Sequence, residues 1–316
     1  MPADHLAGHH STTRLDVLVI GEALVDIVVS AHGTLEHPGG SPANVAYGLG
    51  RLGAATTLMT SISDDRHGRA IRDHLSSADV RLVPGSVKPG STATATAVLA
   101  SDRSAQYDFD IAWDIPRSSP AALPKILHTG SVASFLSPGA AKVRALLEQS
   151  HQRCLVTYDP NIRPALLGSH HEALATFEAL VPLTDVIKLS DEDAQWLYPK
   201  LQMEDVPEHL LKLGTGLVAV TRGAEGSRIQ TENTRIDVPA MRSSVVDTIG
   251  AGDAYMSALI YGLLMRGTDG LAPTVLESLG QMASKAAAIT VRRAGAQPPT
   301  LEELHQRLPE SQPADG

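Results

Sequence analysis

The chain has 316 residues, of which 43% are hydrophobic and 19% charged, and its formal net charge is -9. A chain of this length can bury roughly 75% of its unfolded surface in a large core, and its acidic balance argues against a nucleic-acid binder or a polybasic membrane-surface protein. No apolar run approaches the roughly 20 residues of a membrane helix, the N-terminus has no signal-peptide run, and the one cysteine excludes an internal disulfide, so we expect a cytoplasmic protein.

From residue 15 onward, short apolar runs alternate with longer amphipathic segments. The runs are nearly continuous, as is typical of strands buried on both faces of a parallel sheet, and predict strands at 17–20, 58–61, 126–129, 155–158, 186–189 and 217–221. Apolar residues at helical spacing predict helices at 44–52, 66–76, 138–150, 172–181, 253–265 and 271–293. This alternation predicts an α/β fold, a three-layer αβα sandwich around a mainly parallel, doubly wound sheet.

Three segments break the alternation of strands and helices. Residues 25–29 follow the first strand too closely for a crossover helix, and residues 92–98 and 106–113 alternate apolar and polar side chains. A period of two is typical of antiparallel strands with one face in water. We expect a small β-sheet hinged on the main one; the alternative is an ordinary hairpin at the edge of the main sheet.

The stretch Val-Val-Asp-Thr-Ile-Gly-Ala-Gly-Asp at 245–253 carries the most chemical information. We expect a β-rich segment to end at Val246 and a helix to begin near Gly252. Gly250, Ala251 and Gly252 leave the backbone bare where this helix begins. Free N–H groups and the positive end of the helix dipole would then form an anion site. The Gly-Lys-Ser/Thr of a Walker A motif does not follow.

Asp253 lies in the first turn of that helix and has two interpretations. An acid at a helix N-terminus stabilises the helix by about 0.3–1 kcal/mol and needs no further role. In a phosphoryl-transfer site, the same carboxylate would accept the proton of an attacking hydroxyl while the bare amides hold the phosphoryl group. Spacing alone leaves both interpretations open.

A second stretch with adjacent glycines, Gly-Gly-Ser-Pro-Ala-Asn at 39–44, precedes an amphipathic helix. Gly39 and Gly40 permit positive φ values and a close approach of a ligand to the backbone. Asn44 opens the helix, where it is either an N-cap or an amide that binds sugar hydroxyls with both of its polar atoms.

These two motifs, in this order and about 210 residues apart, resemble those of the ribokinase-like sugar kinases, the phosphofructokinase-B family. Residues 247–253 match the second family motif at every defining position. The first motif matches over 39–53 and then departs, because Ser63 stands where the family usually has glycine before two aspartates. Together the two motifs are highly specific for the family.

The resemblance covers residues 15–299 and implies a kinase domain that uses ATP and Mg²⁺ under a β lid. The expected ranges are 15–308 for the domain, about 25–37 and 90–115 for the lid, and 1–14 and 309–316 for flexible termini.

By the same resemblance, Asp253 is the implied general base, with Gly250, Ala251 and Gly252 as the anion hole. The residues implied to bind the sugar hydroxyls are Asp26, Gly39, Gly40, Asn44 and Asp253. An acid inside an apolar run, such as Asp26, needs a polar partner in any case.

The nucleotide site is implied by resemblance alone. The strand and turn at 220–226 resemble the family segment that contacts ATP, and small residues on the last long helix would flank the adenine. Residues 188–193 occupy the place of another nucleotide-binding motif. The cofactor-binding residues implied in this way are Lys188, Ser190, Thr221, Gly223, Gly226, Gly250, Gly252, Ser284 and Ala287.

Two metal sites are also implied. In the family, an acid three residues into the motif at 190 organises magnesium-bound water; here it is Asp193, one methylene shorter than the usual Glu, with Glu192 as the alternative. A loop at 293–296 resembles one that holds a monovalent cation such as K⁺. The residues implied for that cation are Asp247, Ile249 and Gly295.

The segment Asp-Pro-Asn-Ile-Arg at 159–163 bears on the acceptor, because it follows a buried strand and so lies at the ligand edge of the sheet. It resembles fructokinases and 2-keto-3-deoxygluconate kinases, which makes Asp159, Asn161 and Arg163 candidate sugar ligands. The Arg163 guanidinium would pair with a substrate carboxylate, as a keto-acid sugar requires, or with an ATP phosphate; the remaining alternative is a surface arginine. Tyr107 and Phe109 on the lid would stack on a sugar face.

We therefore expect an ATP-dependent kinase that converts fructose to fructose 6-phosphate. The alternatives are a 2-keto-3-deoxygluconate kinase or other sugar or nucleoside kinase of the family, and a catalytically silent sugar or nucleotide sensor. The expected partners are the sugar and ATP, not nucleic acid or a membrane, and an exposed face of the lid is a candidate homodimer surface.

Overall fold

The structure is a computed structural model that describes residues 15–30, 33–99, 105–116, 123–267 and 271–306. The expected flexible termini, 1–14 and 309–316, lie outside the described residues, as do 31–32 and 100–104 of the expected lid.

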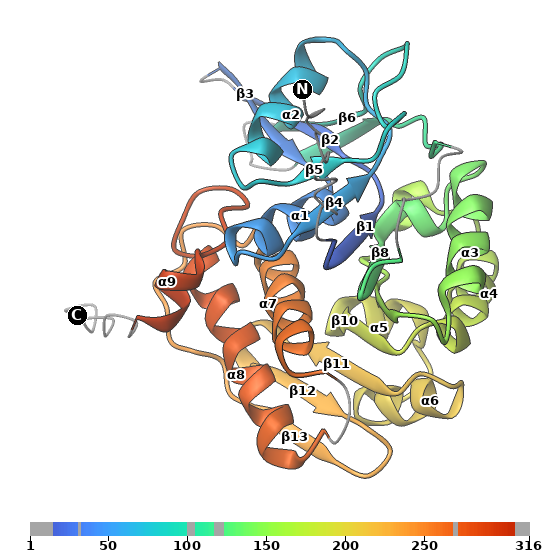
Figure 1. Ribbon diagram of the computed structural model, residues 1–316, viewed down its shortest axis with the longest axis vertical. Helices are drawn as coiled ribbons and strands as arrows, with labels where there is room; N and C mark the ends of the chain where they lie inside the picture. The colour runs from blue at the N-terminus through green and yellow to red at the C-terminus, as the bar shows by residue number, and fades with distance from the viewer. Residues whose placement is uncertain (1–14, 31–32, 100–104, 117–122, 268–270, 307–316) are drawn as a thin grey trace, which may run out of the picture.

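A large sheet forms the centre of the molecule, and within the described residues it has nine strands (Figure 1). Seven are parallel, and β12 and β13 add an antiparallel hairpin at one edge. In spatial order the strands are β13 (Arg235–Val238), β12 (Ser227–Gln230), β11 (Leu217–Thr221), β10 (Val186–Ser190), β9 (Leu155–Asp159), β8 (Ile126–Gly130), β1 (Val17–Ile20), β4 (Thr56–Met59) and β5 (Arg81–Leu82).

Helices cover both faces of this sheet and bury a hydrophobic core on each side. Successive strand residues point to opposite faces, so Val17 and Val19 belong to one core, whereas Leu18 and Ile20 belong to the other. The first core contains residues of α1 (Ser41–Arg51), α2 (Arg66–Ser76), α7 (Ala251–Arg266) and α8 (Pro273–Thr290). The second contains residues of α3 (Gly139–Ser150), α4 (His170–Leu180), α5 (Asp191–Leu197) and α6 (Val206–Lys212). The predicted three-layer αβα sandwich is therefore confirmed.

A separate four-stranded sheet lies at one end of the large sheet, at the top of Figure 1. Its order is β3 (Gly33–Gly39), β2 (Leu24–Ser30), β6 (Thr94–Leu99) and β7 (Ala105–Asp110). The prediction of a small second sheet is confirmed, with one difference: β2 and β6 pair in parallel, while the two outer pairs are antiparallel. Its strand β3 ends at Gly39 and α1 begins at Ser41, so the small sheet leads directly into α1.

The expected β-rich segment ending at Val246 is wrong. Residues 239–246 form no strand, and Val245 and Val246 are 64% and 65% exposed. β-branched residues favour an extended backbone. The Val246 amide, however, donates to the carbonyl of Val291, and no strand among the described residues pairs with this segment. α7 then begins one residue before the expected position.

The beginning of α1 also differs from expectation, because the helix starts at Ser41 and not at Asn44. Gly40 is the N-cap, and Pro42 lies in the first turn. Proline is tolerated there because the N–H that it lacks would have no hydrogen-bond partner within the helix. Asn44 is therefore inside the helix, and its interpretation as an N-cap is wrong. The short β3, α5, α6 and the β12–β13 hairpin were not expected from the sequence.

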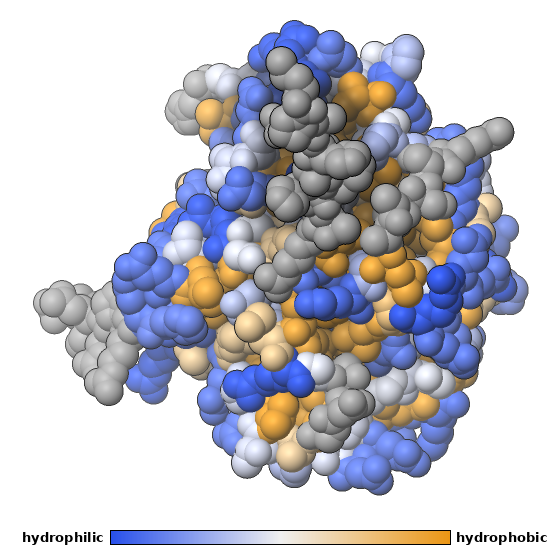
Figure 2. Space-filling model, viewed as in Figure 1, coloured by the Kyte–Doolittle hydropathy of each residue, from blue (hydrophilic) through white to orange (hydrophobic). Residues whose placement is uncertain are grey.

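The surface in Figure 2 is hydrophilic around much of its outline, with hydrophobic residues gathered in the middle of this face below the small sheet. None of the helices in the described part of the chain is long and apolar enough to cross a membrane.

Candidate active site

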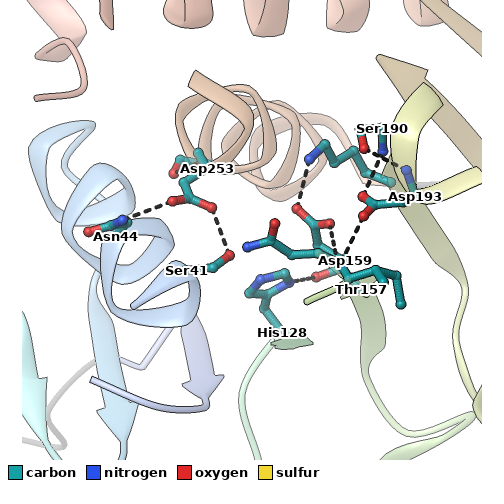
Figure 3. A network of polar contacts seen from close by, with 12 residues as sticks. Ser41, Asn44, His128, Thr157, Asp159, Ser190, Asp193 and Asp253 are labelled. Atoms are coloured by element: carbon teal, nitrogen blue, oxygen red, sulfur yellow. Dashed lines mark hydrogen bonds and ion pairs between the residues drawn. The ribbon is translucent and has the colours of Figure 1, made fainter. Parts of the chain in front are cut away.

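Asp253 lies where the beginnings of α1 and α7 meet (Figure 3). Its Oδ1 accepts a hydrogen bond from Ser41 Oγ at 2.7 Å, and its Oδ2 accepts one from Asn44 Nδ2 at 2.9 Å. Ser41 and Asn44 are three residues apart on one helix face, so both can reach the same carboxylate. The structure thus joins the two sequence motifs at one acid. Sequence reasoning missed Ser41, although its place three residues before Asn44 was a usable signal.

The backbone at the beginning of α7 is bare. Gly250, the N-cap, has a φ of 76°, and a Cβ added there would lie 2.5 Å from Ala296 Cβ. Within the described residues, the amides of Gly252 and Asp253 donate to no other group of the chain. Free amides at a helix N-terminus attract anions, so the predicted anion site has the required backbone.

A buried ion pair lies beneath this helix beginning. Lys188 Nζ and Asp159 Oδ2 are 2.9 Å apart, and Asp159 Oδ1 accepts from the Asn161 amide at 3.3 Å. Burial raises the pKa of Asp159 to about 6, although Lys188 opposes the shift. Burial alone would lower the pKa of Lys188, but nearby carboxylates, Asp159 first, raise it above its ordinary value. With the pKa of Asp159 at about 6 and that of Lys188 above its ordinary value, both groups are charged at neutral pH.

Asp193 ties two loops together at the edge of the sheet (Figure 3). Its Oδ2 accepts from the Ser190 amide at 3.0 Å and its Oδ1 from the Ile162 amide at 2.8 Å, while Ser190 Oγ accepts from the Asp193 amide at 3.0 Å. This arrangement is a capping box at the beginning of α5. Asp193 is buried and Glu192 is exposed. A role of either acid in organising magnesium-bound water stays a prediction.

His128 is a buried polar residue that sequence reasoning missed. Its Nδ1 lies 2.9 Å from Thr157 Oγ1 on the neighbouring strand, and its Nε2 has no hydrogen-bond partner among the described residues. Burial lowers its pKa to about 3, so the ring is neutral at physiological pH. A histidine inside a strand that is buried throughout was the available signal.

Asp26 in β2 is the acid on the small-sheet side of the site. Burial raises its pKa to about 6, Asp253 adds to the shift, and Arg163 and His37 oppose it. A Cβ on Gly39 would lie 2.0 Å from Asp26 Oδ2, so only glycine leaves room for this carboxylate. The Arg163 side chain is exposed, and its Nη1 donates to the carbonyl of Ile162 at 3.0 Å.

Glu22 is a second buried acid near Arg163. Burial raises its pKa to about 8, and its carboxylate accepts from the Ala133 amide at 3.2 Å. Gly40, with a φ of 96°, packs against the Glu22 backbone, where an added Cβ would lie 2.7 Å from the carbonyl oxygen. The sequence motif around Gly39 and Gly40 is therefore explained by close packing against the end of β1 and the beginning of β2.

The strand register places Phe109 and Asp26 on the same face of the small sheet. Phe109 pairs with Ala95, and Ala95 pairs with Asp26. Tyr107 is two residues earlier in β7, and its side chain lies outside the described residues. Stacking of either ring on a sugar stays a prediction.

Other residues predicted for ATP lie after β11 and on α8, and those predicted for the monovalent cation lie in two loops. β11 ends at Thr221, and the following turn contains Gly223 and Gly226, both with positive φ. Ser284 and Ala287 lie on α8, which packs along α7. The loop residues Asp247, Ile249 and Gly295 come together, because Asp247 Oδ1 accepts from the Ile249 amide at 3.0 Å and Oδ2 from the Gly295 amide at 2.9 Å.

In the described part of the chain, no three His, Cys, Asp or Glu side chains form a group that could hold a metal ion. The acids of the site instead accept hydrogen bonds from amides, hydroxyls and one ammonium. A preassembled cage of acids is not required for Mg²⁺, which in phosphate-transfer sites is usually held by one or two carboxylates together with the substrate phosphates.

The chain is similar to known carbohydrate kinases over almost its whole length. The pfkB family of carbohydrate kinases matches residues 14–303. A fructokinase of Rhizobium leguminosarum bv. trifolii is 30% identical over 260 residues, which cover 79% of this chain and 80% of the relative. The structure of a Xylella fastidiosa fructokinase with bound ATP has a TM-score of 0.79 at 25% identity, covering 92% of this chain and 96% of that one. A Vibrio cholerae O395 fructokinase double mutant with fructose, ADP and potassium ion bound has a TM-score of 0.79 at 26% identity, covering 93% and 98%.

Proposed function

The chain belongs to the pfkB family of carbohydrate kinases, and from this premise we propose that it transfers the γ-phosphoryl group of ATP to the 6-hydroxyl of fructose. The enzyme is an ATP-dependent phosphotransferase that acts on an alcohol group. The observation that carries the proposed mechanism is the Asp253 carboxylate, held by Ser41 and Asn44 beside free amides at the beginning of α7.

In the proposed step, the sugar oxygen attacks the γ-phosphorus and a new O–P bond forms. The bond between that phosphorus and the bridging oxygen breaks, and its electron pair leaves with ADP. Asp253 takes the proton of the attacking hydroxyl. Gly250 and Gly252 would hold the transferring group through amides that are free in the described part of the chain and need no reorganisation. The third residue of the predicted anion hole, Ala251, already donates its amide to the Thr248 carbonyl at 3.2 Å and would contribute through its place in the first turn of α7.

Asp26 would accept hydrogen bonds from sugar hydroxyls, with Gly39, Gly40, Asn44 and Asn161 completing the sugar pocket. Phe109 and Tyr107 would stack on the sugar from the small sheet. We propose that this sheet acts as a lid, since Asp26 and Phe109 share the face that carries the sugar ligand. Its closure would exclude water and so prevent hydrolysis of ATP.

ATP would be held by the residues predicted from the sequence: Lys188, Ser190, Thr221, Gly223, Gly226, Ser284 and Ala287. Mg²⁺ bound to its phosphates would neutralise part of their charge, with Asp193 or Glu192 orienting a water on the ion. Asp247, Ile249 and Gly295 would hold a monovalent cation; a potassium ion is bound in the Vibrio cholerae relative.

Two other acceptor classes compete with fructose. Arg163 is near enough to Asp26 and Glu22 to influence both acids, and from there a guanidinium could bind the carboxylate of 2-keto-3-deoxygluconate. The other is a sugar or nucleoside acceptor of another family member. Fructose is favoured because Arg163 is exposed at the rim and is also suited to an ATP phosphate.

A coupled assay of ADP release tests the proposal with purified enzyme, Mg²⁺, ATP and each of fructose, ribose, 2-keto-3-deoxygluconate, tagatose phosphate and adenosine. We expect the highest kcat/KM with fructose. A higher value with the keto acid, together with its loss in Arg163→Ala, would contradict fructose as the acceptor. Sugar binding without turnover for every acceptor would indicate a silent sensor.

We propose further that the protein acts in the cytoplasm, where ATP is abundant and a lone cysteine stays reduced. The small sheet is also the proposed homodimer surface. Val28 and Leu35 pair across its β2–β3 ladder, and Leu35 is 62% exposed. Light scattering of the purified protein should give twice the monomer mass, and Leu35→Glu should halve it.

A further inference from the structure

The chain first enters the small sheet through a short connection that Glu22 anchors. β1 ends at Ile20 in the large sheet and β2 begins at Leu24 in the small one, so Glu22 lies in the middle of this connection. It is 3% exposed, and its Oε2 accepts a hydrogen bond from the Ala133 amide at 3.2 Å. Ala133 belongs to the 3₁₀ turn η1 (Ser131–Ser134), which follows β8.

The segment by which the chain finally leaves the small sheet is anchored on the same residue. Trp113 follows β7, and its Nε1 donates to the Ala133 carbonyl at 3.0 Å. The indole ring is buried at the beginning of α3, where a Cβ added to Gly139 would lie 2.3 Å from the ring nitrogen. The N–H and the C=O of Ala133 therefore each hold one of the two segments that join the small sheet to the large one.

Ala133 is a firm anchor, because its turn is tied to the ends of three strands of the large sheet. Ser134 Oγ lies 2.9 Å from the hydroxyl of Tyr158 on β9. Thr129 Oγ1 donates to the Ile20 carbonyl at 2.9 Å, which joins β8 to the end of β1. All five residues are buried, and hydrogen bonds are stronger where water is excluded.

The connection at Glu22 lies beside the proposed sugar site. Asp26 is near the beginning of β2, directly beyond the connection. A Cβ added to Gly40 would lie 2.7 Å from the Glu22 carbonyl oxygen, so the beginning of α1 packs closely on the same segment. Arg163 influences the carboxyl groups of both Glu22 and Asp26. A displacement of Glu22 would therefore change the position of Asp26 relative to α1.

We propose that Glu22 and Trp113 are positioning residues that hold the small sheet, and with it Asp26, in the geometry that binds the sugar, and that both act through Ala133. This inference rests on the proposed function, in which Asp26 is a sugar ligand, and deepens it. Neither side chain would touch the substrate or take part in the transfer of a proton or a phosphoryl group. Loss of either hydrogen bond should therefore weaken sugar binding and leave the chemical step intact.

The first experiment compares Glu22→Leu with the conservative variant Glu22→Gln in the ADP-release assay. Burial raises the pKa of Glu22 to about 8, so the carboxyl group is mostly neutral at pH 7, and glutamine keeps its shape and an oxygen for the Ala133 amide. Leucine leaves this buried amide without a partner. Glu22→Leu should raise the sugar KM about tenfold and keep kcat and the KM for ATP within about threefold, whereas Glu22→Gln should change all three by less than about threefold.

The second experiment replaces the indole donor. Trp113→Phe should also raise the sugar KM about tenfold, and it provides the test alone if Glu22→Leu does not fold. Trp196→Phe is the matched control, since Trp196 is the other tryptophan of the chain, and it should leave KM unchanged. Unchanged KM in both Glu22→Leu and Trp113→Phe, with lower melting temperatures, would assign the two hydrogen bonds to stability alone and overturn the proposal.

The double variant Glu22→Leu/Trp113→Phe tests whether the two residues share one anchor. If the small sheet keeps its position only while both hydrogen bonds to Ala133 are made, the second substitution adds little to the first. The sugar KM of the double variant should then rise much less than the roughly hundredfold product of two independent effects. A rise equal to that product would overturn the shared anchor.

Fluorescence quenching tests the link between Glu22 and Trp113 without any substrate. In a Trp196→Phe background Trp113 is the one tryptophan of the chain, and its burial should shield it from acrylamide. Adding Glu22→Leu should raise the quenching constant of the ligand-free protein about twofold or more, and adding Glu22→Gln should not. An equal constant in all three proteins would overturn the link.

Calorimetric titration with fructose separates failure of this inference from failure of the proposed function. A wild-type protein that binds fructose and phosphorylates no acceptor would contradict the proposed function. In that case the Kd for fructose replaces the KM: a rise of about tenfold in Glu22→Leu and in Trp113→Phe would support the positioning role. A Kd equal to that of the wild type in both variants would overturn it.

Discussion

Replacement of Asp26 by asparagine tests whether the charge of this buried acid lowers the free energy of unfolding. Burial and the nearby Asp253 carboxylate raise the pKa of Asp26, although Arg163 and His37 oppose the shift. A neutral amide of the same size has no charge to desolvate or repel. We therefore expect Asp26→Asn to stabilise the folded chain at neutral pH, although it removes a proposed sugar ligand.

The magnitude follows from the pKa of Asp26, which rises from 3.8 to about 6. A difference of about 2 pKa units corresponds to about 3 kcal/mol of stability lost while the acid is ionised in both states. The full cost applies above pH 6. As the pH falls from 6 towards 3.8, folded Asp26 takes up a proton before the unfolded chain does, so the cost disappears over that window.

Thermal unfolding measured between pH 7.5 and pH 4 checks this prediction. The melting temperature of Asp26→Asn should exceed that of the wild type by roughly 5 °C at pH 7.5, and the gap should close near pH 4. Asp108→Asn is the control, since Asp108 is exposed on the same sheet, and it should change little. A less stable Asp26→Asn, or a gap that stays constant with pH, would refute the reasoning. In the ADP assay, the sugar KM of Asp26→Asn should rise about 10- to 100-fold, because charged hydrogen bonds contribute about 1.5–3 kcal/mol each.

Three further substitutions separate the parts of the site. Asp253→Asn removes the proposed base, so kcat should fall about 10²–10⁴-fold with little change in melting temperature; near-normal turnover would contradict that role. Ser41→Ala removes the 2.7 Å donor to Asp253, so kcat should fall about tenfold at an unchanged sugar KM, with Ser41→Cys in between, and a rise in KM alone would instead make Ser41 a sugar ligand. Gly250→Ala places a Cβ 2.5 Å from Ala296 Cβ at a φ of 76°, which should cost about 1–3 kcal/mol in urea unfolding; equal stability would show that the loop adapts.

The layers of the fold were predictable because buried parallel strands have apolar residues on both faces. Residues 17–20 are all buried, and alternate members enter the two cores. Short elements without an apolar run were not predictable: α5 has seven residues and begins with three acids, and β12 is Ser-Arg-Ile-Gln, so neither a run nor a period shows. The apolar run at 245–246 misled for a related reason: its composition favours a strand, but strand formation needs a neighbour.

The site was predictable only where a residue belongs to a motif. Asp253 and Asn44 were found in this way, but their mutual hydrogen bond depends on the packing of α1 against α7. The pairing of His128 with Thr157 depends on the register of β8 and β9, which the sequence does not reveal. Lys188 was noticed as part of a motif, whereas its closeness to Gly252 appears only in three dimensions.

Asp26 and Asp253 show why stability and the proposed activity oppose each other in this chain. The two acids come from opposite sides of the site, and the Asp253 carboxylate disfavours the charged form of Asp26. Hydroxyl donors of a sugar between them would stabilise both charges and replace the water that burial removes. The repulsion between these carboxylates therefore lowers the stability of the chain without ligand. Its relief by hydroxyl donors favours ligands that have several hydroxyls. On this argument, neutral substitutions at Asp26 increase stability for the same reason that they weaken sugar binding.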